Sequence, residues 1–499
     1  MAHRVLQRHL TFSVLLLLTS APGVALAGDS FPLGQLTTGP VGCPDSEAFG
    51  PSISADGKLI AYPDCRVTAG SSFANIVLYD AGSGEAVQVT SNTNCTNIAP
   101  ALSADGKRVA FVSNCDHTGG NADRNSDVFL YDRDAESIQQ ITNTTEFGIF
   151  SPAINGDGTR IVIPSNQHLT GSGRENNPDL YLFDTVSNMF TQLTSPPVCR
   201  RTGSAAMSAD GTRVAFLSSC MLTDRPRSPL AHQYVIDTTT GIISEITIDN
   251  TCGSLCNQPP AISGDGKLIA FGSSLNLGAP HTGFYELYSY HVDNSTLERE
   301  TITTMQCVNG ASTSVNHDGS TIAFSSGCDP LGTNPDGSVE IFLLDPTSNT
   351  LMQLTDVTPA PMSNRCVSHL PSIDAAGTHI AFQSSCNLTG NNPALRAQIF
   401  FAGSGIVPMN STPTATVGVA TATPTAMATA IPTTPGEVCS GDCNGTGTVT
   451  VDEVIALVNI ALGNADESAC ALGVPDGTPA DVVLIIQAVG YALNGCESS

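Results

Sequence analysis

The chain has 499 residues, with 19 Lys and Arg against 45 Asp and Glu, which gives a formal net charge of −26. Such an acidic balance repels phosphate backbones and argues against a nucleic-acid partner. The chain also has no tryptophan, which argues against a flat aromatic platform for sugars.

Residues 1–27 have the pattern of a secretory leader. Arg4 and Arg8 precede the apolar run FSVLLLL, and the small residues ALA close the segment. No other stretch approaches ~18 consecutive apolar residues, so we expect no membrane span. We therefore expect a secreted protein, extracellular or periplasmic. In that setting the 16 cysteines favour disulfides over metal sites.

One sequence unit recurs seven times between residues 28 and 406. Its clearest copy is PALSADGKRVAF, and the glycine of its turn falls at positions 57, 106, 158, 211, 266, 319 and 377. Each copy contains four extended segments, and Asp-Gly between the first two favours a tight hairpin. Four antiparallel strands repeated at this period predict an all-β fold, a seven-bladed β-propeller.

A short orphan segment, GQLTT, precedes the first copy at residues 34–38. It resembles the strings QVT, QIT and QLT that end the other units as fourth strands. The seventh unit has PSID, THIAFQSS and AQIFFAG, but it lacks a fourth strand. We therefore expect the orphan segment to pair with the last blade and to close the ring.

The repeated motif resembles the TolB-like family of propeller repeats. The match is P-x-φ-S-x-D-G-x-x-I-A-F, with φ apolar, followed by YD and LT, and it covers about residues 30–406. The resemblance implies a propeller, and such propellers serve as binding scaffolds, as partners in envelope complexes and as enzymes. Some of the enzymes resemble pectin-fragment lyases with a metal-binding channel mouth.

In five units a cysteine precedes the Asp-Gly turn and another follows it, 20–22 residues apart. Residues equidistant from a hairpin turn lie opposite each other, so the spacing suits disulfides at the hairpin's open end. In the fifth unit, where CGSLC offers a zinc alternative but no second ligand pair, we expect Cys252 to bond Cys256. The other expected pairs are Cys43–Cys65, Cys95–Cys115, Cys199–Cys220, Cys307–Cys328 and Cys366–Cys386.

These bridges would stiffen the face that commonly binds ligands around the channel mouth. On the fourth unit they would gather a cluster of arginines suited to carboxylates or phosphates. Ordinary pairing with surface acids such as Asp224 is the simpler alternative. In the loop DRNSD, Asp123, Asn125 and Asp127 alternate in a spacing that can wrap calcium, although an Asx-rich turn also explains it. The arginines are Arg200, Arg201, Arg225 and Arg227.

Catalytic motifs are missing. The sequence contains neither G-x-S-x-G nor H-E-x-x-H, and the histidines of the mature chain are scattered over the units. No catalytic residues are nominated, so a noncatalytic role is favoured. The alternative is a propeller enzyme, a lyase or hydrolase, acting on acidic polysaccharide fragments.

Residues 407–437 are rich in Thr, Pro and Ala and read as an extended tether. Residues 438–499 begin with a loop of the EF-hand calcium type, followed by an amphipathic helix. Thr446 stands where Asp is usual, so we expect weaker calcium binding. The expected ligands are Asp442, Asn444, Thr446, Thr448 and Glu453.

A second half of this module repeats the loop and helix in degraded form, with Leu472 and Val474 at ligand positions. The duplicated arrangement resembles a dockerin domain, which implies a cohesin-like partner. A small calcium-stabilised cap is the alternative. Four cysteines here, Cys439, Cys443, Cys470 and Cys496, allow three disulfide pairings.

The sequence therefore predicts a secreted, disulfide-reinforced propeller joined by a tether to a dockerin-like calcium module. Its expected role is noncatalytic binding of a ligand or protein partner, with an anionic carbohydrate among the candidate ligands.

Overall fold

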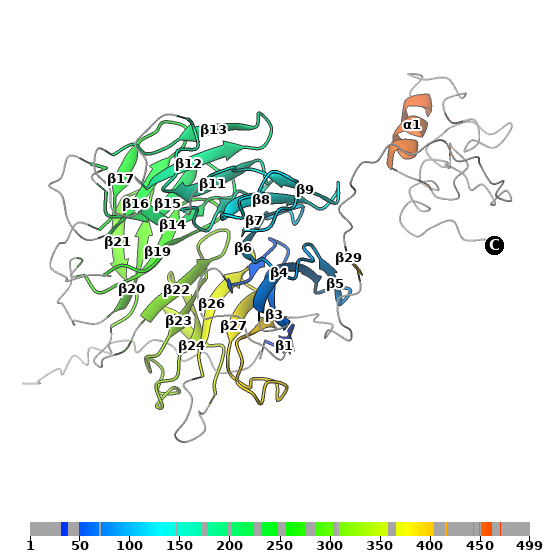
Figure 1. The fold of residues 1–499 in the computed structure, drawn as a ribbon. Coiled ribbons are helices and arrows are strands. Elements are labelled where there is room, and N and C mark those ends of the chain that lie inside the picture. Colours follow the sequence, from blue (N-terminus) through cyan, green and yellow to red (C-terminus); the bar gives the residue numbers. More distant parts are fainter. Residues whose placement is uncertain are drawn as a thin grey trace, which may run out of the picture. The chain divides into compact units, whose positions relative to one another are not determined.

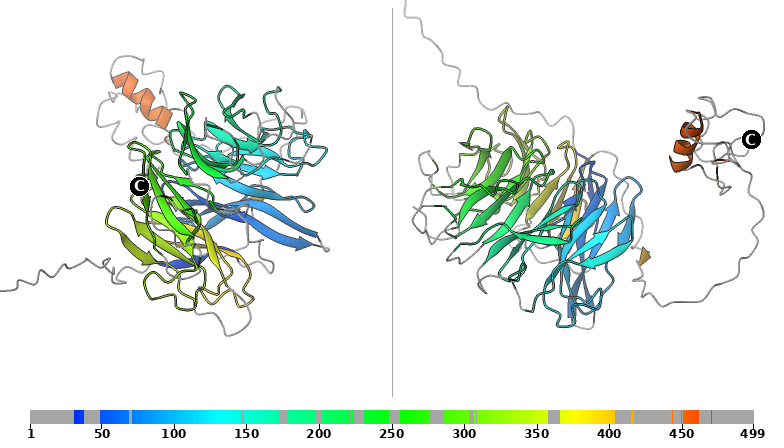
Figure 2. Two further views of the ribbon diagram at one scale, coloured as in Figure 1. Left: turned by 90° about the vertical axis from the view of Figure 1, so that its left-hand side faces the viewer. Right: turned by 90° about the horizontal axis from the view of Figure 1, so that it is seen from above.

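The computed structural model describes residues 31–37, 49–68, 71–145, 148–171, 178–196, 202–220, 222–223, 231–247, 256–275, 277, 285–302, 307, 309–357, 366–403, 415–416, 443, 449, 451–461 and 470. The chain divides into two compact units, residues 1–420 and 421–499. In the first unit, seven four-stranded antiparallel sheets stand side by side around a common centre, as Figures 1 and 2 show. The prediction of a seven-bladed propeller is confirmed.

The strands follow chain order from the inside of each blade outward. Blade 1 contains β2 (Ser52–Ile53), β3 (Leu59–Thr68), β4 (Ser71–Asp80) and β5 (Glu85–Gln88), and blade 2 contains β6 (Asn97–Leu102), β7 (Arg108–Ser113), β8 (Asp127–Asp132) and β9 (Ser137–Gln140). Blade 3 contains β10 (Ala153–Ile154), β11 (Arg160–Ser165), β12 (Asp179–Asp184) and β13 (Met189–Gln192), and blade 4 contains β14 (Thr202–Met207), β15 (Arg213–Ser218), β16 (His232–Asp237) and β17 (Ile243–Glu245).

Blade 5 contains β18 (Ala261–Ile262), β19 (Leu268–Ser273), β20 (Glu286–His291) and β21 (Thr296–Arg299), and blade 6 contains β22 (Asn309–Val315), β23 (Ile322–Ser326), β24 (Glu340–Asp345) and β25 (Thr350–Gln353). Blade 7 contains β26 (Ser368–Ile373), β27 (Ile380–Ser384), β28 (Gln398–Ala402) and, from the start of the chain, β1 (Leu33–Gln35). The short β29 (Ala415–Thr416) pairs in parallel with β5.

The core lies between neighbouring blades. The second and third strands of each blade are apolar on both faces because each sheet packs against two others. Phe111 and Phe129, for example, sit opposite each other on β7 and β8 and stack at 5.9 Å, within a cluster that also takes Leu59, Ile76 and Leu78 from blade 1. Such stacked pairs recur in blades 4, 5, 6 and 7.

The Asp-Gly hairpins are held by a short side-chain relay. In blade 1, Ser54 Oγ donates to Asp56 Oδ1 over 2.7 Å, while the N–H groups of Lys58 and Leu59 donate to these two side chains. Blade 7 lacks the turn aspartate. There Asp374, which stands at the serine position, accepts from the N–H groups of both Thr378 and His379, so one carboxylate replaces the pair.

A ring of backbone hydrogen bonds joins the seven hairpins at this end of the propeller, which we call the turn end. Each bond crosses from one blade to the next, and the circuit closes between blades 7 and 1. The donors and acceptors are small residues except for His317 and two turn aspartates. The bonds, of 2.8–3.2 Å, are Ala55 N to Ala104 O, Asp105 N to Gly156 O, Gly156 N to Ala209 O, Ala209 N to Gly264 O, Asp265 N to His317 O, His317 N to Ala375 O and Ala375 N to Ala55 O.

The expected ring closure by the N-terminal segment is confirmed. Gln35 of β1 pairs with Phe400 of β28, and Leu36 is buried with 1% of its surface exposed. Thr37 then repeats a bond made in the other blades: its Oγ1 donates to Gln398 over 2.5 Å and accepts from Ile399 N. In blade 2, Thr142 bonds Asp127 and Val128 N in the same way.

In the second unit the structure describes one helix, α1 (Val451–Ala461), in which Leu457 is fully buried. A disulfide joins Cys443 to Cys470, which is one of the pairings left open by the sequence. No helix in the described part of the chain is long and apolar enough to cross a membrane.

Candidate functional site at the disulfide end of the propeller

The inner strands surround a central channel. Three cavities lie along it, of about 200, 330 and 160 Å³ from the end opposite the turns toward the turn end. Their walls are mainly small and apolar, with Asn155, His317 and Asp374 among the lining residues at the turn end. Prolines from five blades line the outermost cavity: Pro51, Pro100, Pro152, Pro260 and Pro371.

Backbone strain occurs on the inner strands of three blades, and in two of them it directly precedes a lining proline. Ala99, Ser204 and Leu370 have φ of 53°, 46° and 55°, a region that side chains rarely adopt. Each lies within a register shift between the first and second strands of its blade. Bulges re-aim the chain, and strain of this kind clusters at binding sites. The channel mouth opposite the turn end is therefore the candidate site.

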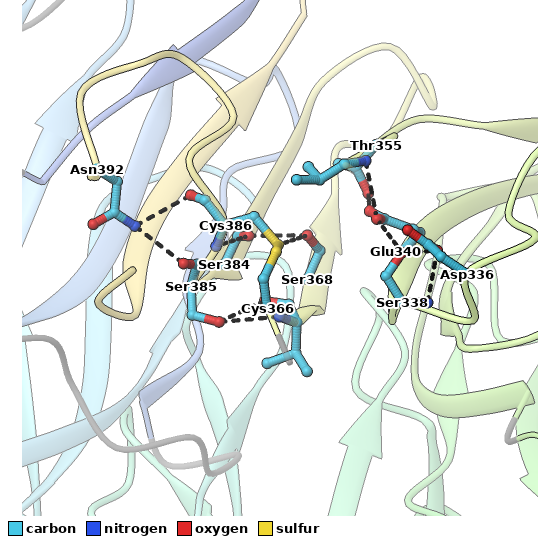
Figure 3. Close-up of a disulfide and its surroundings, with 12 residues drawn as sticks. Asp336, Ser338, Glu340, Thr355, Cys366, Ser368, Ser384, Ser385, Cys386 and Asn392 are labelled. Carbon is cyan, nitrogen blue, oxygen red and sulfur yellow. Dashed lines mark hydrogen bonds between the residues drawn. A yellow bond between two sulfur atoms is a disulfide. The ribbon is translucent and has the colours of Figure 1, made fainter. Parts of the chain in front are cut away.

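Disulfides brace the rim of this mouth, which we call the disulfide end. The structure contains Cys95–Cys115, Cys307–Cys328 and Cys366–Cys386, with Cα atoms 4.9–5.3 Å apart; Figure 3 shows the last of these. All three are pairs that the spacing predicts. Cys65, Cys220 and Cys256 are also disulfide-bonded, while their expected partners Cys43, Cys199 and Cys252 lie outside the described residues.

Three of these cysteines begin loops of identical length, residues 115–127, 328–340 and 386–398, which we call the bridge loops. A buried asparagine organises each one. Asn121 Nδ2 donates to the carbonyls of Cys115 and Asn125, while Asn121 N donates to Asp116 Oδ1. Asn334 and Asn392 make the corresponding bonds in the other two loops. The amide thus satisfies polar groups of the loop's own backbone where no regular secondary structure does so.

Each bridge loop ends on a residue that begins the third strand of its blade. In blades 2 and 6 this residue is acidic and buried: Asp127 and Glu340 are both fully enclosed. Burial raises the pKa of both carboxyl groups, although hydrogen bonds from Thr142 and Thr355, respectively, oppose the shift. In blade 7 the equivalent residue is the neutral Gln398.

A serine and a histidine meet in blade 2, but not as a nucleophile and its base. Ser113 Oγ lies 3.1 Å from His117 Nε2 and donates to Asn97 Oδ1 over 2.7 Å. His117 Nε2 also lies 2.8 Å from Asn97 Oδ1, and the ring packs edge-on against Phe129. Ser113 is 1% exposed, so substrate cannot reach it.

The pKa of His117 is lowered to about 4, chiefly by burial. Leucine occupies the corresponding position in blades 3, 4, 5 and 7, as Leu169, Leu222, Leu277 and Leu388. This histidine therefore stands at a core position, and its partner Asn97 supplies the polar contact that the ring requires.

Several residues expected to be functional lie outside the described residues: Arg200, Arg201, Arg225 and Arg227 of blade 4, and Asp442, Asn444, Thr446 and Thr448 of the calcium loop. Glu453 belongs to α1. Within the described ranges, no three His, Cys, Asp or Glu side chains are grouped so that they could hold a metal ion.

Sequence reasoning missed the organising asparagines of the bridge loops. Their signal is visible: Cys-Asx-x-x-Gly-x-Asn followed, after five residues, by the first residue of the third strand. It is hard to recognise because only three blades carry it and because each loop differs from the others at most remaining positions.

No family model matches the chain, and no curated protein matches its sequence. Among solved structures, an oligogalacturonate lyase from Vibrio parahaemolyticus is similar with a TM-score of 0.50 and 15% identity, over 75% of this chain and 93% of the lyase. The β-propeller domain of the trilobed protease from Pyrococcus furiosus is similar with a TM-score of 0.50 and 14% identity, over 75% of this chain and 97% of that domain.

TolB from Acinetobacter baumannii also matches, with a TM-score of 0.37 and 17% identity over 71% of this chain and 83% of TolB. At such identities the likeness shows the fold alone. The protease propeller has an open velcro topology, whereas in this chain β1 pairs with β28 and closes the last blade. The two similar structures with a TM-score of 0.50 come from a lyase and from a protease, so the fold by itself assigns no activity to this chain.

Proposed function

We propose that this protein is an exported binding scaffold whose propeller takes a ligand or a protein partner at the disulfide end. Its C-terminal module, in this proposal, binds calcium through the Asp442–Glu453 loop and attaches or stabilises the molecule. The observation that carries the proposal is the construction of the disulfide end. Three disulfides and three bridge loops with buried asparagines hold that surface in one conformation.

A surface fixed in advance loses little conformational entropy when it binds, which raises affinity. Loops on a rigid scaffold are also where propellers and other folds commonly place recognition. The turn end has less need of such reinforcement, because backbone bonds already join its blades. The disulfides are therefore best explained as support for recognition at the opposite end. They also favour an oxidising compartment outside the cytoplasm.

The four arginines of blade 4 make an anionic ligand the first candidate. Oligogalacturonate is the probe, with binding measured by calorimetry on the full chain. We expect binding without turnover, and loss of binding in Arg225→Ala/Arg227→Ala. Lys107→Ala/Lys267→Ala, which removes two exposed bases at the turn end, is the matched control and should bind normally.

The same mixture of protein and oligogalacturonate tests the alternative that the protein is an enzyme. Release of unsaturated products from oligogalacturonate, abolished by a chelator, would replace the scaffold with a lyase. Equal loss of binding in the arginine and lysine variants would overturn the assignment to the disulfide end. If no oligogalacturonate binds, the anionic carbohydrate is removed from the proposal, and the ligand is a protein.

A cohesin-type domain tests the role of the C-terminal module. We expect calcium-dependent capture, which Glu453→Gln should weaken at low calcium concentration because the bidentate ligand of the loop is lost. Calcium binding without capture would support the alternative of a calcium-stabilised cap.

A further inference from the structure

The bridge loops of blades 2 and 6 share a second pattern inside their common frame. Four oxygen-bearing side chains alternate along each: Asn121, Asp123, Asn125 and Asp127 in blade 2, and Asn334, Asp336, Ser338 and Glu340 in blade 6. The blade 7 loop has the same length and the same central asparagine, but Ala394, Arg396 and Gln398 replace the rest. The blade 7 loop therefore has neither carboxylate, and it has the positively charged Arg396 in addition.

In blade 6 the four oxygens converge. Ser338 Oγ lies 3.0 Å from Asn334 Oδ1, 3.0 Å from Asp336 Oδ1 and 2.7 Å from Glu340 Oε1; Figure 3 shows Ser338 between Asp336 and Glu340. A hydroxyl has one hydrogen and can donate to one acceptor at a time. Two carboxylates and an amide oxygen thus surround one hydroxyl that can donate to only one of them at a time, although Asp336 also accepts from Ser338 N and Glu340 also accepts from Thr355 Oγ1 and Val357 N.

In blade 2 the corresponding amide oxygens have no partner at all. Asn121 is fully buried and Asn125 is 4% exposed, and the Oδ1 atoms of both lack any hydrogen bond. Asn121 Nδ2 makes the same two bonds as Asn334 Nδ2, so the two amides are held in the same way, while Asn125 Nδ2 donates to Thr144 and Asp127 accepts from Thr142 and Thr144. Leaving such oxygens unpaired costs about 1–3 kcal/mol each.

Blade 7 shows how the same frame is completed without carboxylates. Asn392 Oδ1 accepts a hydrogen bond from Arg396 N over 3.1 Å, so its amide is satisfied on both sides. The partnerless oxygens therefore belong to blade 2, one of the two loops that carry two carboxylates; in blade 6 the equivalent Asn334 Oδ1 accepts only from the Ser338 hydroxyl. In blade 7 the N–H of Arg396 supplies the hydrogen bond that these oxygens lack.

We propose that the bridge loops of blades 2 and 6 each bind a calcium ion, which the loop of blade 7 does not. The ligands are the alternating side-chain oxygens, completed by water or backbone carbonyls. Carboxylate, amide and hydroxyl oxygens are hard ligands that suit calcium, which accepts six to eight of them in flexible geometry. With two carboxylates per site and amides for the rest, affinity falls in the range of extracellular modules, ~10⁻⁴–10⁻³ M.

Asp123→Asn and Asp336→Asn test the proposal. Both carboxylates are exposed, and asparagine can keep the local turn, so the fold should survive while one charge leaves each site. The measurement is calorimetric titration of calcium into the full chain carrying Asp442→Ala/Glu453→Gln, which silences the C-terminal loop. We expect two sites in this background, one in each single variant and none in the double variant.

The matched control is Asp134→Asn, which removes an exposed carboxylate that pairs with Lys107; it should leave both sites intact. Hydrogen exchange gives a second readout: calcium should slow exchange in residues 121–127 and 334–340 but leave 392–398 unchanged. Equal calcium binding in the double variant would overturn the proposal. Equal hydrogen exchange with and without calcium would also overturn the proposal. That result is expected if buried water, and not calcium, binds the partnerless oxygens.

Discussion

The two ends of the propeller are built on different principles. At the turn end all seven blades use one hairpin, and a backbone ring joins them. At the disulfide end the blades differ in cysteine content and in the bulges of their inner strands, and three of the loops that the structure describes in full are bridge loops. One end therefore fixes the number and spacing of the blades, and the other is free to vary between them.

The glycines show the same contrast. A Cβ on Gly57 would approach the His379 ring of blade 7 to 2.5 Å, and one on Gly211 would approach Arg160 of blade 3 to 2.8 Å. At the disulfide end, a Cβ on Gly119, Gly171 or Gly390 would meet nothing within 4 Å. All five glycines have positive φ. The two sets differ in whether a neighbouring blade lies within contact distance of the added Cβ.

Reduction of the disulfides should produce the largest effect, and it should be confined to one end. Each closed loop of about 20 residues contributes about 3 kcal/mol in the chain-entropy model. Reduced protein should lose several kcal/mol of unfolding free energy in denaturant titrations. Hydrogen exchange should rise first in the bridge loops. Faster exchange at the turn-end ring before the loops would contradict the division between the two ends.

The pH dependence of stability should reveal the histidine of blade 2. Because the pKa of His117 is about 4 in the folded protein and ~6.5 when unfolded, the unfolded chain takes up the extra proton. Stability should therefore fall as pH decreases from about 6.5 to about 4, by about 3 kcal/mol.

His117→Leu, which installs the residue of four other blades, should flatten this part of the curve. Denaturant titrations at several pH values give the measurement. The control is Leu222→Met at the corresponding position of blade 4, which changes no titrating group and should keep the wild-type slope. An unchanged slope in His117→Leu would contradict the assignment.

Two glycine substitutions measure the contrast between the ends directly. Gly57→Ala and Gly171→Ala both place alanine at positive φ, which costs about 1–2 kcal/mol. Only Gly57→Ala also displaces the His379 ring at the joint between blades 7 and 1, which adds about 1–3 kcal/mol. Equal destabilisation in thermal unfolding would show that neighbouring blades do not press on the turn glycines.

The smallest expected effect is at a surface contact. Arg213 NH1 reaches across to Gly266 O over 3.0 Å and to Asp293 over 3.3 Å, yet Leu59 and Leu268 fill the same position in blades 1 and 5. Arg213→Leu should therefore change the unfolding free energy by less than about 1 kcal/mol. A larger loss in thermal unfolding would show that the guanidinium bond to the next hairpin is structural.

Much of the fold could be predicted from the sequence. The period, the Asp-Gly hairpins and the orphan segment with Leu36 led to seven blades closed by a strand from the start of the chain. These features are local in sequence or repeated, and a single chain displays them. Blade 7 has Ala376 at the position of the turn aspartate, and its compensation by Asp374 two residues earlier is a feature that the repeat pattern does not predict.

The site was harder to predict because its determinants are not periodic. The backbone hydrogen bonds of the turn-end ring require no particular side chain. Their only trace in the sequence is a preference for small residues at Ala55, Ala104 and the equivalent positions. The strained residues Ala99, Ser204 and Leu370 share no residue type, since the strain comes from how the inner strand meets its neighbour. The arginine cluster of blade 4 and the calcium loop of the C-terminal module remain predictions, since nothing in the described residues tests them.

The bond between Thr37 and Ile399 spans 362 positions of the chain. During synthesis, β1 is made before the other strands of the propeller, and its partner β28 is the last blade strand to be made. Blade 7 therefore stays three-stranded until these two strands meet, and the core around Leu36 cannot be finished any earlier. Contacts so distant in sequence slow folding, so we expect the propeller ring to close late, when β1 joins β28.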